Sequence, residues 1–221
     1  AVHAAGYDSE GNYLGDQTVT WSSTGTLDPA ASGSGPVFTF NPAGAPATGT
    51  LVATHGTAGS DATNTITVSV GQANNVRVLT GASGNTAEVS TSSLTSGSTL
   101  SVHAASFDAD GNYIQDVSVS WSVSGGIGSL SSSSGVSTTF TASTPGTGVI
   151  TADHATLLDD ATGTITVNAG NLAYVLVVEG PSGDGPGLGA RALTADQTLT
   201  VHAAGYDAND NYLGDESVTW S

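Results

Sequence analysis

The sequence predicts an all-β protein made of tandem β-sandwich domains, and three observations support this prediction. Short runs rich in Val, Thr, Ile and Ser alternate with clusters of Gly, Ser, Asp and Asn, as strands alternate with turns. Helix signals are nearly absent. One string, found at 2–22, 102–122 and 201–221, recurs at a spacing of about 100 residues, which is the size of one small domain.

The repeat sets the expected domain boundaries. A tryptophan marks the same position in each copy, and "NTITVSVG" (64–71) matches "GTITVNAG" (163–170). We expect a domain over 1–71 that lacks its first strand and the start of its second, a complete domain over 72–170, and the N-terminal half of a third domain over 171–221. The chain is therefore expected to be a segment of a longer array.

Six strand-like segments follow one another in the complete domain. They are "NNVRVLTG" (74–81), "TLSVHAASFD" (99–108), "VSVSWSVSG" (117–125), "VSTTFTAS" (136–143), "GVITADHAT" (148–156) and "GTITVNAG" (163–170). Every second side chain of a strand points to the same face, and the alternation places apolar residues on one face. The expected inward residues include Leu100, Val102, Ala104, Val117, Val119, Val123, Ile150, Ala152 and the three tryptophans Trp21, Trp121 and Trp220. Strands of this number and length predict two packed sheets.

The charge balance excludes several classes of function. Lys and Arg together number 2, Asp and Glu number 19, and the formal net charge is −17. Nucleic-acid binding needs clustered Lys and Arg, and an anionic membrane surface would repel this chain. No apolar run approaches the roughly 18 residues of a membrane span, so no such span is expected in this segment.

Signals for catalysis are missing as well. The chain has no cysteine, and therefore no thiolate nucleophile. It contains no G-x-S-x-G elbow, no H-E-x-x-H pair and no nucleophile beside a plausible base. We expect no enzyme activity and no catalytic residues.

The strongest candidate for a binding site is a polar turn that each copy contains. In "DADGNYIQD" (108–116), side-chain oxygens stand at relative positions one, three, five and nine, as in loops that bind calcium, and Gly eases the bend. The candidate Ca²⁺ ligands are Asp108, Asp110, Asn112 and Asp116, then Asp8, Glu10, Asn12 and Asp16 in the first copy, and Asp207, Asn209, Asn211 and Asp215 in the third. The twelfth-position Glu of an EF-hand is missing. The alternative is a polar turn in which Asp and Asn cap backbone groups.

The order of these elements resembles the bacterial immunoglobulin-like domains, in particular their invasin and intimin branch. "TLSVHAA" is followed by the D-x-D-G-N turn, by "VSVSWS", by "GVITA" and finally by "GTITV", and the likeness covers the chain once in full and twice in part. The resemblance implies immunoglobulin-like β-sandwiches in a tandem array on a bacterial cell surface, as an adhesin stalk or an assembled extracellular structure. It does not imply an enzyme.

Acidic residues of a second loop are expected near the same turn. In an immunoglobulin-like sandwich, the turn and the loop "DHATLLDDATG" (153–163) lie at the pole where the preceding domain attaches. That loop holds Asp153, Asp159 and Asp160. Unpaired carboxylates would repel one another there, so a calcium ion at each junction would stiffen the array into a rod.

The sequence therefore predicts a non-enzymatic structural segment of a bacterial extracellular surface protein. Its tandem repeats are expected to build a filament or an adhesin stalk, with neighbouring domains and copies of itself as partners. The alternative is an adhesin recognition module that binds a host or neighbour-cell ligand or a glycan, and Tyr13, Tyr113 and Tyr212 are its candidate contacts. Because the turn strings of the copies are nearly alike, the spacer is favoured.

Overall fold

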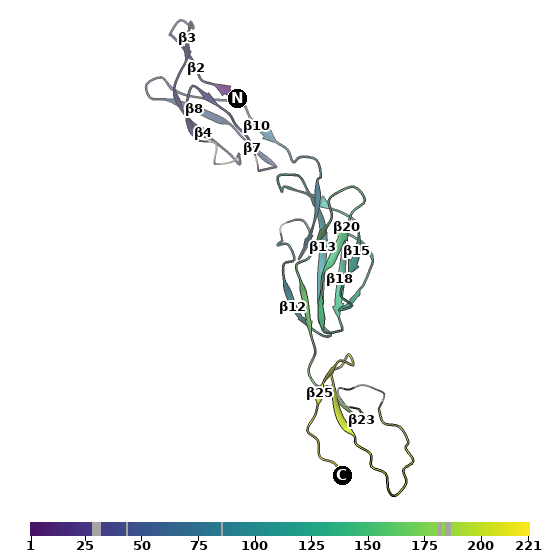
Figure 1. Ribbon diagram of the computed structural model, residues 1–221. Helices are drawn as coiled ribbons and strands as arrows, with labels where there is room; N and C mark the ends of the chain where they lie inside the picture. Colours follow the sequence, from purple (N-terminus) through teal and green to yellow (C-terminus); the bar gives the residue numbers. More distant parts are fainter. Residues whose placement is uncertain (28–31, 43, 85, 181–182, 184–186) are drawn as a thin grey trace. The chain divides into compact units, whose positions relative to one another are not determined.

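The computed structural model describes residues 1–221 except 28–31, 43, 85, 181–182 and 184–186 (Figure 1). Within the described residues the regular structure consists of β-strands, most of them paired antiparallel, and no α-helix is present. The predicted all-β fold is confirmed. In this part of the chain no helix is long and apolar enough to cross a membrane.

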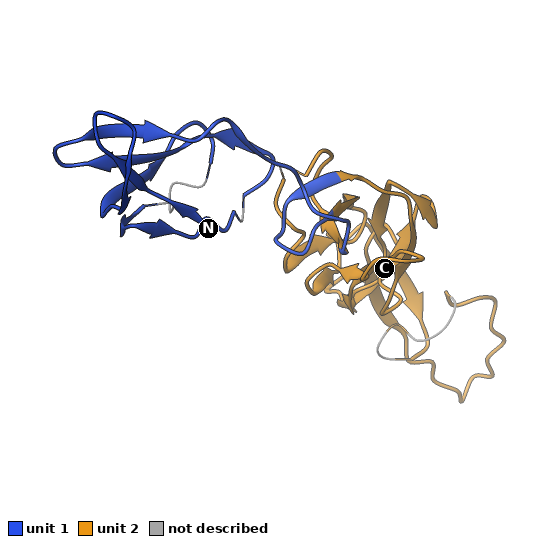
Figure 2. Ribbon diagram, turned by 90° about the horizontal axis from the view of Figure 1, so that it is seen from above, with its two compact units in different colours: residues 1–74, 107–114 blue, residues 75–106, 115–221 orange. Residues whose placement is uncertain are grey.

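The chain divides into two compact units, which Figure 2 shows in different colours. Unit 1 consists of residues 1–74 and 107–114, and unit 2 of residues 75–106 and 115–221. The hairpin turn at 107–114 therefore lies among residues of unit 1. The sequence predicted three domains, and this prediction is not tested by the division into two units.

Unit 2 contains the complete set of strands that the sequence predicts for one sandwich. One sheet has the order β11 (Asn75–Leu79), β13 (Thr99–Phe107), β18 (Ser137–Ala142) and β16 (Gly128–Leu130), with β14 (Tyr113–Asp116) also paired to β13. A second has the order β17 (Ser134–Gly135), β15 (Val119–Val123), β20 (Ile150–Asp153) and β21 (Asp160–Ala161). A third is formed by β12 (Ser92–Thr95), β22 (Ile165–Asn168) and β19 (Gly146–Gly148), and β12 and β22 are parallel.

One apolar core joins these sheets and makes them a sandwich. Val102 and Phe140 come from the first sheet, Trp121 and Ile150 from the second and Ile165 from the third, and all belong to one cluster of buried residues. The alternation explains the pattern, since β15 reads buried, exposed, buried, exposed, half-buried along its length. The predicted inward faces of these strands are thus confirmed.

The last strands of unit 2 form a separate sheet with a small core. β23 (Tyr174–Val178), β24 (His202–Tyr206) and β25 (Tyr212–Asp215) lie in that order, and all neighbours are antiparallel. Only Val178, Ala204 and Tyr206 form the buried cluster among the described residues, with Leu176 packed against it.

Unit 1 repeats the second sheet of the sandwich strand for strand. Its sheet has the order β5 (Gly33–Gly35), β4 (Val19–Ser23), β8 (Leu51–His55) and β9 (Gly59–Ala62). Trp21 on β4 lies opposite Ala53, just as Trp121 on β15 lies opposite Ala152. Three further pairs complete the unit: β1 (Val2–His3) with β6 (Val37–Phe38), β2 (Ala5–Tyr7) with β3 (Tyr13–Asp16), and β7 (Ala47–Gly49) with β10 (Ile66–Val68).

The prediction that the tryptophans lie in the cores is confirmed for two copies and wrong for the third. Trp21 is 3% exposed and Trp121 is 4% exposed. Their Nε1 atoms donate to the carbonyl oxygens of Gly35 and Gly135, at 3.0 and 2.9 Å. Trp220 is 57% exposed, because residues 216–221 form no strand and no second sheet faces them in the described chain.

Candidate functional site

The predicted polar turn forms in all three copies with the same backbone geometry. We call Asp8–Asn12, Asp108–Asn112 and Asp207–Asn211 the aspartate turns, and each connects two antiparallel strands. In the second turn Asp108 N–H donates to the carbonyl of Asn112 at 3.0 Å, and Gly111 N–H donates to that of Asp108 at 3.1 Å. Gly111 has a φ of 84°, which favours glycine, and Asp210 takes this place in the third turn with a φ of 64°.

The side chain of the first aspartate closes each turn. Asp108 Oδ1 accepts the backbone N–H groups of Asp110 at 3.1 Å and Asn112 at 2.8 Å, and the Asn112 side-chain amide donates to both carboxylate oxygens. Asp8 and Asp207 accept the corresponding bonds in their own turns. The D-x-x-x-N spacing therefore specifies a capped turn, which is the alternative that the sequence left open.

Two of the turns also bind the glycine of the preceding linker. Gly71 N–H donates to Asp108 Oδ2 at 2.8 Å, and Gly170 N–H donates to Asp207 Oδ2 at 2.7 Å. In both cases the partners are 37 residues apart. A Cβ atom at either glycine would lie 3.2 Å from the carboxylate Oδ2, so a larger residue would push the aspartate away. This linker bond was not predicted, although the shared glycine of "VSVG" and "VNAG" was a signal for it.

The asparagine of the turn makes a further contact within each unit. In unit 1 the Asn112 side-chain oxygen accepts the N–H of Ala45 at 2.9 Å. In unit 2 the Asn211 side-chain amide donates to Ser96 Oγ at 3.0 Å and to the Ser143 carbonyl at 2.7 Å. Asn209 also donates to Ser96 Oγ, at 2.8 Å. Each of these turns therefore bonds a linker glycine and a loop from an earlier part of the chain.

The hydrogen bonds favour the ionised form of the turn aspartates. The side chain of Asn112, and then the N–H of Gly71, lower the pKa of Asp108 to about 2. At Asp207 burial raises the pKa, but the bonds from Asn211 and Gly170 outweigh this effect and the net pKa is lowered. The Asn12 side chain lowers the pKa of Asp8, which has no linker bond. Asp108 and Asp207 are 3% and 1% exposed, whereas Asp8 is exposed.

The twelve candidate calcium ligands do not form a common cluster in the described residues. Those residues contain no group of three or more His, Cys, Asp or Glu that could hold a metal ion. The fourth member of each set is bound elsewhere: Asp116 accepts the N–H of Ser83, Asp16 bonds His3 and Tyr13, and Asp215 bonds His202 and Tyr212. Asp110 and Glu10 are exposed. Calcium binding remains a prediction, and it would require oxygens that now accept N–H groups.

The acidic residues of the second loop also bond their own backbone. Asp160 Oδ2 accepts the N–H of Val78 at 2.7 Å, and Asp159 Oδ1 accepts the N–H of His154 at 2.8 Å. These bonds hold β11 and the loop 154–159 in place. The expected gathering of these carboxylates with the aspartate turn stays a prediction.

An aromatic pair accompanies every aspartate turn. The ring before the aspartate contacts the tyrosine after the turn, with centroids 5.8 Å apart for Tyr7 and Tyr13 and 5.9 Å apart for Phe107 and Tyr113. Tyr206 and Tyr212 form the third pair, at 5.9 Å. Phe107 and Tyr206 are 5% and 8% exposed, whereas Tyr13 is 59% exposed. The candidate tyrosines therefore belong to the hairpins, and they face solvent most in the first copy.

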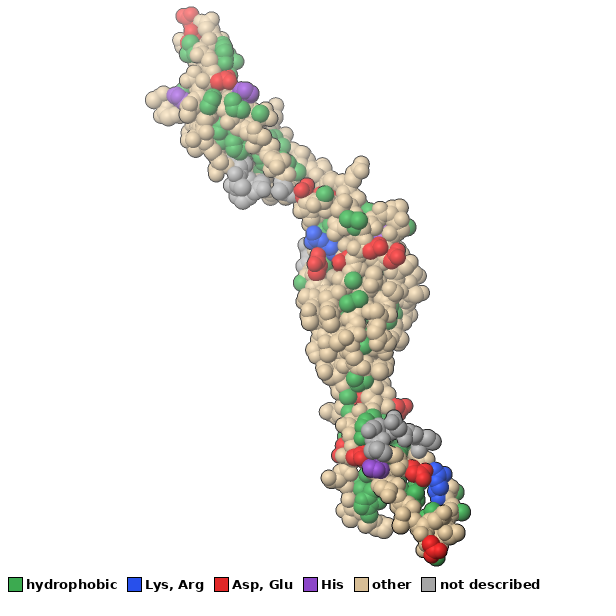
Figure 3. Space-filling view, viewed as in Figure 1, with side chains coloured by type: hydrophobic (Ala, Val, Ile, Leu, Met, Phe, Trp, Pro, Cys, Tyr) green, Lys and Arg blue, Asp and Glu red, His purple; other side chains and the backbone are tan. Residues whose placement is uncertain are grey.

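Both cations of the chain are paired with glutamates. Arg77 Nε lies 3.2 Å from Glu88, and Arg191 lies 2.6 Å from Glu179. On the face shown in Figure 3, acidic side chains are scattered and the basic ones stand at separate places. Each arginine therefore has a carboxylate partner.

Comparisons with known proteins give a distant likeness to surface-layer proteins. No family model matches the chain, and no curated protein matches it. A structure of surface layer protein SbsC, domains 4–9, is 16% identical with a TM-score of 0.27, over 96% of this chain and 32% of that chain. A crystal structure of S-layer protein SbsC domains 4 and 5 is 16% identical with a TM-score of 0.29, over 74% of this chain and 78% of that chain. Because these TM-scores are low, the function is argued from the residues of this chain.

Proposed function

We propose that this chain is a non-enzymatic structural segment of a bacterial extracellular surface protein, built of tandem repeats of the bacterial immunoglobulin-like type. The repeats act as spacers in a stalk or filament outside the cell. The observation that carries this proposal is the bond from a linker glycine to the next turn aspartate, which occurs at Gly71–Asp108 and again at Gly170–Asp207. A spacer requires repeats that do not swing freely, and this bond ties the end of one repeat to a hairpin of the next.

Because the linkers are short, the bond between the linker glycine and the turn aspartate restricts their motion. Residues 72–74 alone separate Gly71 from β11, and residues 171–173 alone separate Gly170 from β23. Fixing the glycine at one end leaves few rotatable backbone angles before the next strand begins. The acceptor is an ionised carboxylate, and hydrogen bonds to charged groups are stronger than those between neutral groups. The bond therefore restricts the linker more than an ordinary backbone contact would.

The shifted pKa values have structural causes, which supports a role without catalysis. A strongly shifted group in a cleft is a candidate for catalysis. Here the lowered pKa values belong to the turn aspartates and to Asp16 and Asp215. The pKa of each of these two is lowered first by a hydrogen bond with a histidine and then by one from a tyrosine. Each of these aspartate carboxylates stabilises a turn or a pair of strands.

The test is to remove the linker bond and measure the freedom of the repeats. In the variant Asp108→Ala/Asp207→Ala both linker bonds are lost, so small-angle X-ray scattering should give a broader distribution of maximum dimensions than for the wild-type chain. The matched control is Asp8→Ala, which removes the same capped turn without a linker bond. The control should scatter like the wild-type chain.

The result also decides whether the aspartate turns restrain the motion of neighbouring repeats. If the double variant and the wild-type chain scatter alike, the linker bond does not restrain the repeats and the spacer proposal loses its main support. If Asp8→Ala broadens the distribution equally, the turn acts through the stability of its own hairpin. Circular dichroism of all variants separates both results from a loss of folding.

Calcium at the aspartate turns is a competing proposal for the same joints. A cation there would take carboxylate oxygens that now accept N–H groups from Gly71, Asp110 and Asn112. The donor set as folded does not fit a resident ion, and the hydrogen bonds provide the restraint without one. Electron microscopy before and after chelation distinguishes the two versions.

A recognition module for a ligand or glycan is the second candidate. Tyr7 and Tyr13 favour it, since they are 61% and 59% exposed and form a ring pair at one hairpin. In the next two hairpins the first ring of the pair is buried, which fits a role in packing. A glycan array with the wild-type chain and Tyr13→Ala tests this role, and binding that is lost in the variant would favour it over the spacer.

A further inference from the structure

A loop of seven residues begins with histidine and ends with aspartate in both units. In unit 2 it reads "HATLLDD" (154–160) and connects β20 to β21, and in unit 1 it reads "HGTAGSD" (55–61) and connects β8 to β9. The two strings share only the histidine, the threonine two residues later and the final aspartate. These three residues are therefore the candidates for a role that both loops have in common.

The histidine ring fixes the start of the loop in unit 2. His154 Nδ1 accepts the backbone N–H of Thr156 at 3.3 Å and that of Leu157 at 3.2 Å. A backbone N–H can only donate, so Nδ1 must carry a lone pair, and the imidazole must be neutral with its hydrogen on Nε2. Asp159 Oδ1 accepts the N–H of His154 at 2.8 Å and closes the loop from its other end.

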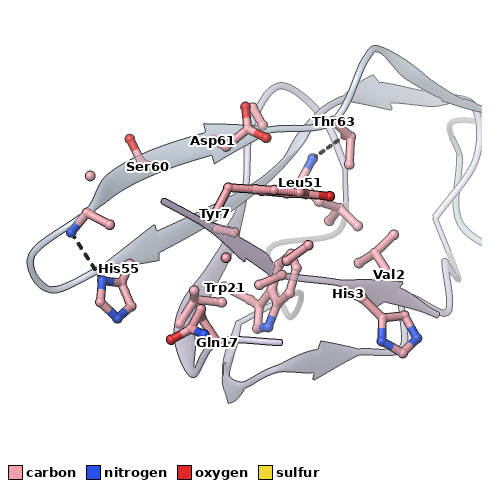
Figure 4. A pocket seen from close by; sticks show the side chains of 18 of the residues that line it. Val2, His3, Tyr7, Gln17, Trp21, Leu51, His55, Ser60, Asp61 and Thr63 are labelled. Carbon is pink, nitrogen blue, oxygen red and sulfur yellow. Dashed lines mark hydrogen bonds between the residues drawn. The ribbon is translucent and has the colours of Figure 1, made fainter. Parts of the chain in front are cut away.

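The same arrangement occurs in unit 1. His55 Nδ1 accepts the N–H of Thr57 at 3.4 Å and that of Ala58 at 3.1 Å, and Figure 4 shows His55 with a bond to its loop. Most of the other loop residues differ between the two units. The contact is therefore a property of the histidine and not of one particular loop sequence.

In unit 2 this loop also holds the first strand of the sandwich. The carbonyl of Leu158 accepts the N–H of Val76 at 2.9 Å, and Leu158 lies opposite Asn75 in a parallel bridge. Asp160 Oδ2 accepts the N–H of Val78 at 2.7 Å. Two N–H groups of β11 are thus bonded to residues of the loop, so the position of β11 depends on the loop being closed.

Charged side chains on the neighbouring elements act on the ring as well. Those of unit 2 are Asp153 of β20, Asp159 in the loop, Asp160 of β21, and Arg77 of β11, which pairs with Glu88 at 3.2 Å. β15, the other neighbour of β20, has no charged residue. In unit 1 the corresponding residue is Asp61 of β9, and β4 has no charged residue. The carboxylates would attract an imidazolium, and this attraction is the effect that opposes opening of the loop.

We propose that His154 and His55 are acid-sensitive switches of these two loops. Histidine changes its charge between about pH 5 and about pH 8, and a protonated ring has an N–H at both nitrogens and no acceptor. The bonds to Nδ1 are therefore made at the upper end of this range and are lost as the pH falls. In unit 2 their loss frees the loop 154–159, and with it the Leu158 carbonyl that holds the start of β11.

The switch goes beyond the spacer role and does not rest on it, because it acts within one repeat. β11 begins at Asn75, directly after the linker 72–74, so acidification loosens the strand that follows the joint. Val76 and Val78 of this strand are each 1% exposed when the loop is closed. Opening therefore gives water access to one edge of the core.

Backbone hydrogen exchange, measured by NMR on the whole chain, tests the switch. The exchange rate of each N–H is compared with that of an unstructured peptide at the same pH, and the ratio gives a protection factor free of the direct effect of pH. Between about pH 8 and about pH 5 the protection factors of Leu157 and Val76 should fall roughly fivefold, as expected for the loss of about one hydrogen bond. Ala58 should respond in the same way in unit 1, whereas Phe140 in the core should not.

Two matched variants assign the effect to the histidines. Asparagine places an acceptor oxygen near the position of Nδ1 and does not titrate. His154→Asn should therefore keep the protection of Leu157 at both pH values while Ala58 still responds, and His55→Asn should give the reverse.

A third variant controls for the loss of a histidine elsewhere in unit 2. His103→Gln removes the histidine of β13 and should leave the response of Leu157 to acid as it is in the wild-type chain. Circular dichroism checks that every variant is folded.

Three outcomes would overturn the proposal. The first is protection of Leu157 and Ala58 that does not change with pH in the wild-type chain. The second is protection that rises on acidification, since attraction between the imidazolium and Asp159 would then close the loop. The third is a fall that persists in His154→Asn, because another titrating group would then open the loop.

Discussion

At the scale of single residues, the turn aspartates illustrate how one side chain can serve two levels of structure. Asp108 closes its own hairpin through Asp110 and Asn112, and with its second oxygen it holds Gly71. The spacing of Asp and Asn made the capped turn predictable. The linker bond was not predictable in the same way, because a backbone N–H leaves no trace in the residue type beyond the need for a small side chain at Gly71.

The lowered pKa of Asp108 predicts how stability responds to acid. Its folded pKa is about 2, below the ordinary value of 3.8, so its contribution to stability is present above 3.8 and is lost as the pH falls toward 2. Asn cannot titrate, so Asp108→Asn should be less stable than the wild-type chain near neutral pH and should lose less stability on acidification. Urea unfolding at about pH 5 and about pH 2.5 measures both effects.

The control for this prediction lies in the same turn. Asp110→Asn changes an exposed carboxylate of the hairpin. The free energy of unfolding of this variant should change between the two pH values by as much as it does in the wild-type chain. If Asp108→Asn and the wild-type chain lose the same stability on acidification, the bonds from Asn112 and Gly71 do not favour the ionised form.

At the scale of elements, the strands with clear alternation were predictable and the short ones were not. The segments 74–81, 99–108 and 117–125 contain β11, β13 and β15. The sequence did not predict β16, β17 or β19, which have two or three residues each and are rich in Gly and Ser. Such short strands form because a longer strand pairs with them. β16, for example, is the edge strand that pairs with β18, which contains Phe140. Periodicity carries no information over so few residues.

The unequal burial of two equivalent phenylalanines predicts that they contribute unequally to the stability of the two units. Phe140 on β18 is 0% exposed, and Phe40 at the matching position of unit 1 is half-buried. Phe140→Ala should cost about 3–5 kcal/mol of the free energy of unfolding. Phe40→Ala should cost clearly less, because this ring is already partly in contact with water.

Hydrogen exchange during urea titration measures these losses separately, since peptides from 37–40 and 137–142 report on different units. Phe40→Ala is at the same time the matched control for Phe140→Ala. Equal losses would contradict the prediction, because they would mean that Phe40 is packed as tightly as Phe140.

At the scale of the whole molecule, the repeat is the feature that the sequence predicted most clearly. The sheet β5-β4-β8-β9 and the sheet β17-β15-β20-β21 repeat one strand order, and the tryptophan of each bonds a glycine carbonyl. The division into three domains that the repeat predicts stays a prediction beside the two compact units. What the repeat could not predict is the bond from each linker glycine to the turn aspartate, because this bond uses a backbone N–H group.

Electron microscopy of the purified chain, in calcium and again after chelation, tests whether calcium makes the joints between repeats rigid. We expect the same particles in both conditions, because the oxygens of Asp108 and Asp207 already accept N–H groups. Particles that bend or fall apart on chelation would contradict this expectation and would assign the rigidity of the joints to calcium.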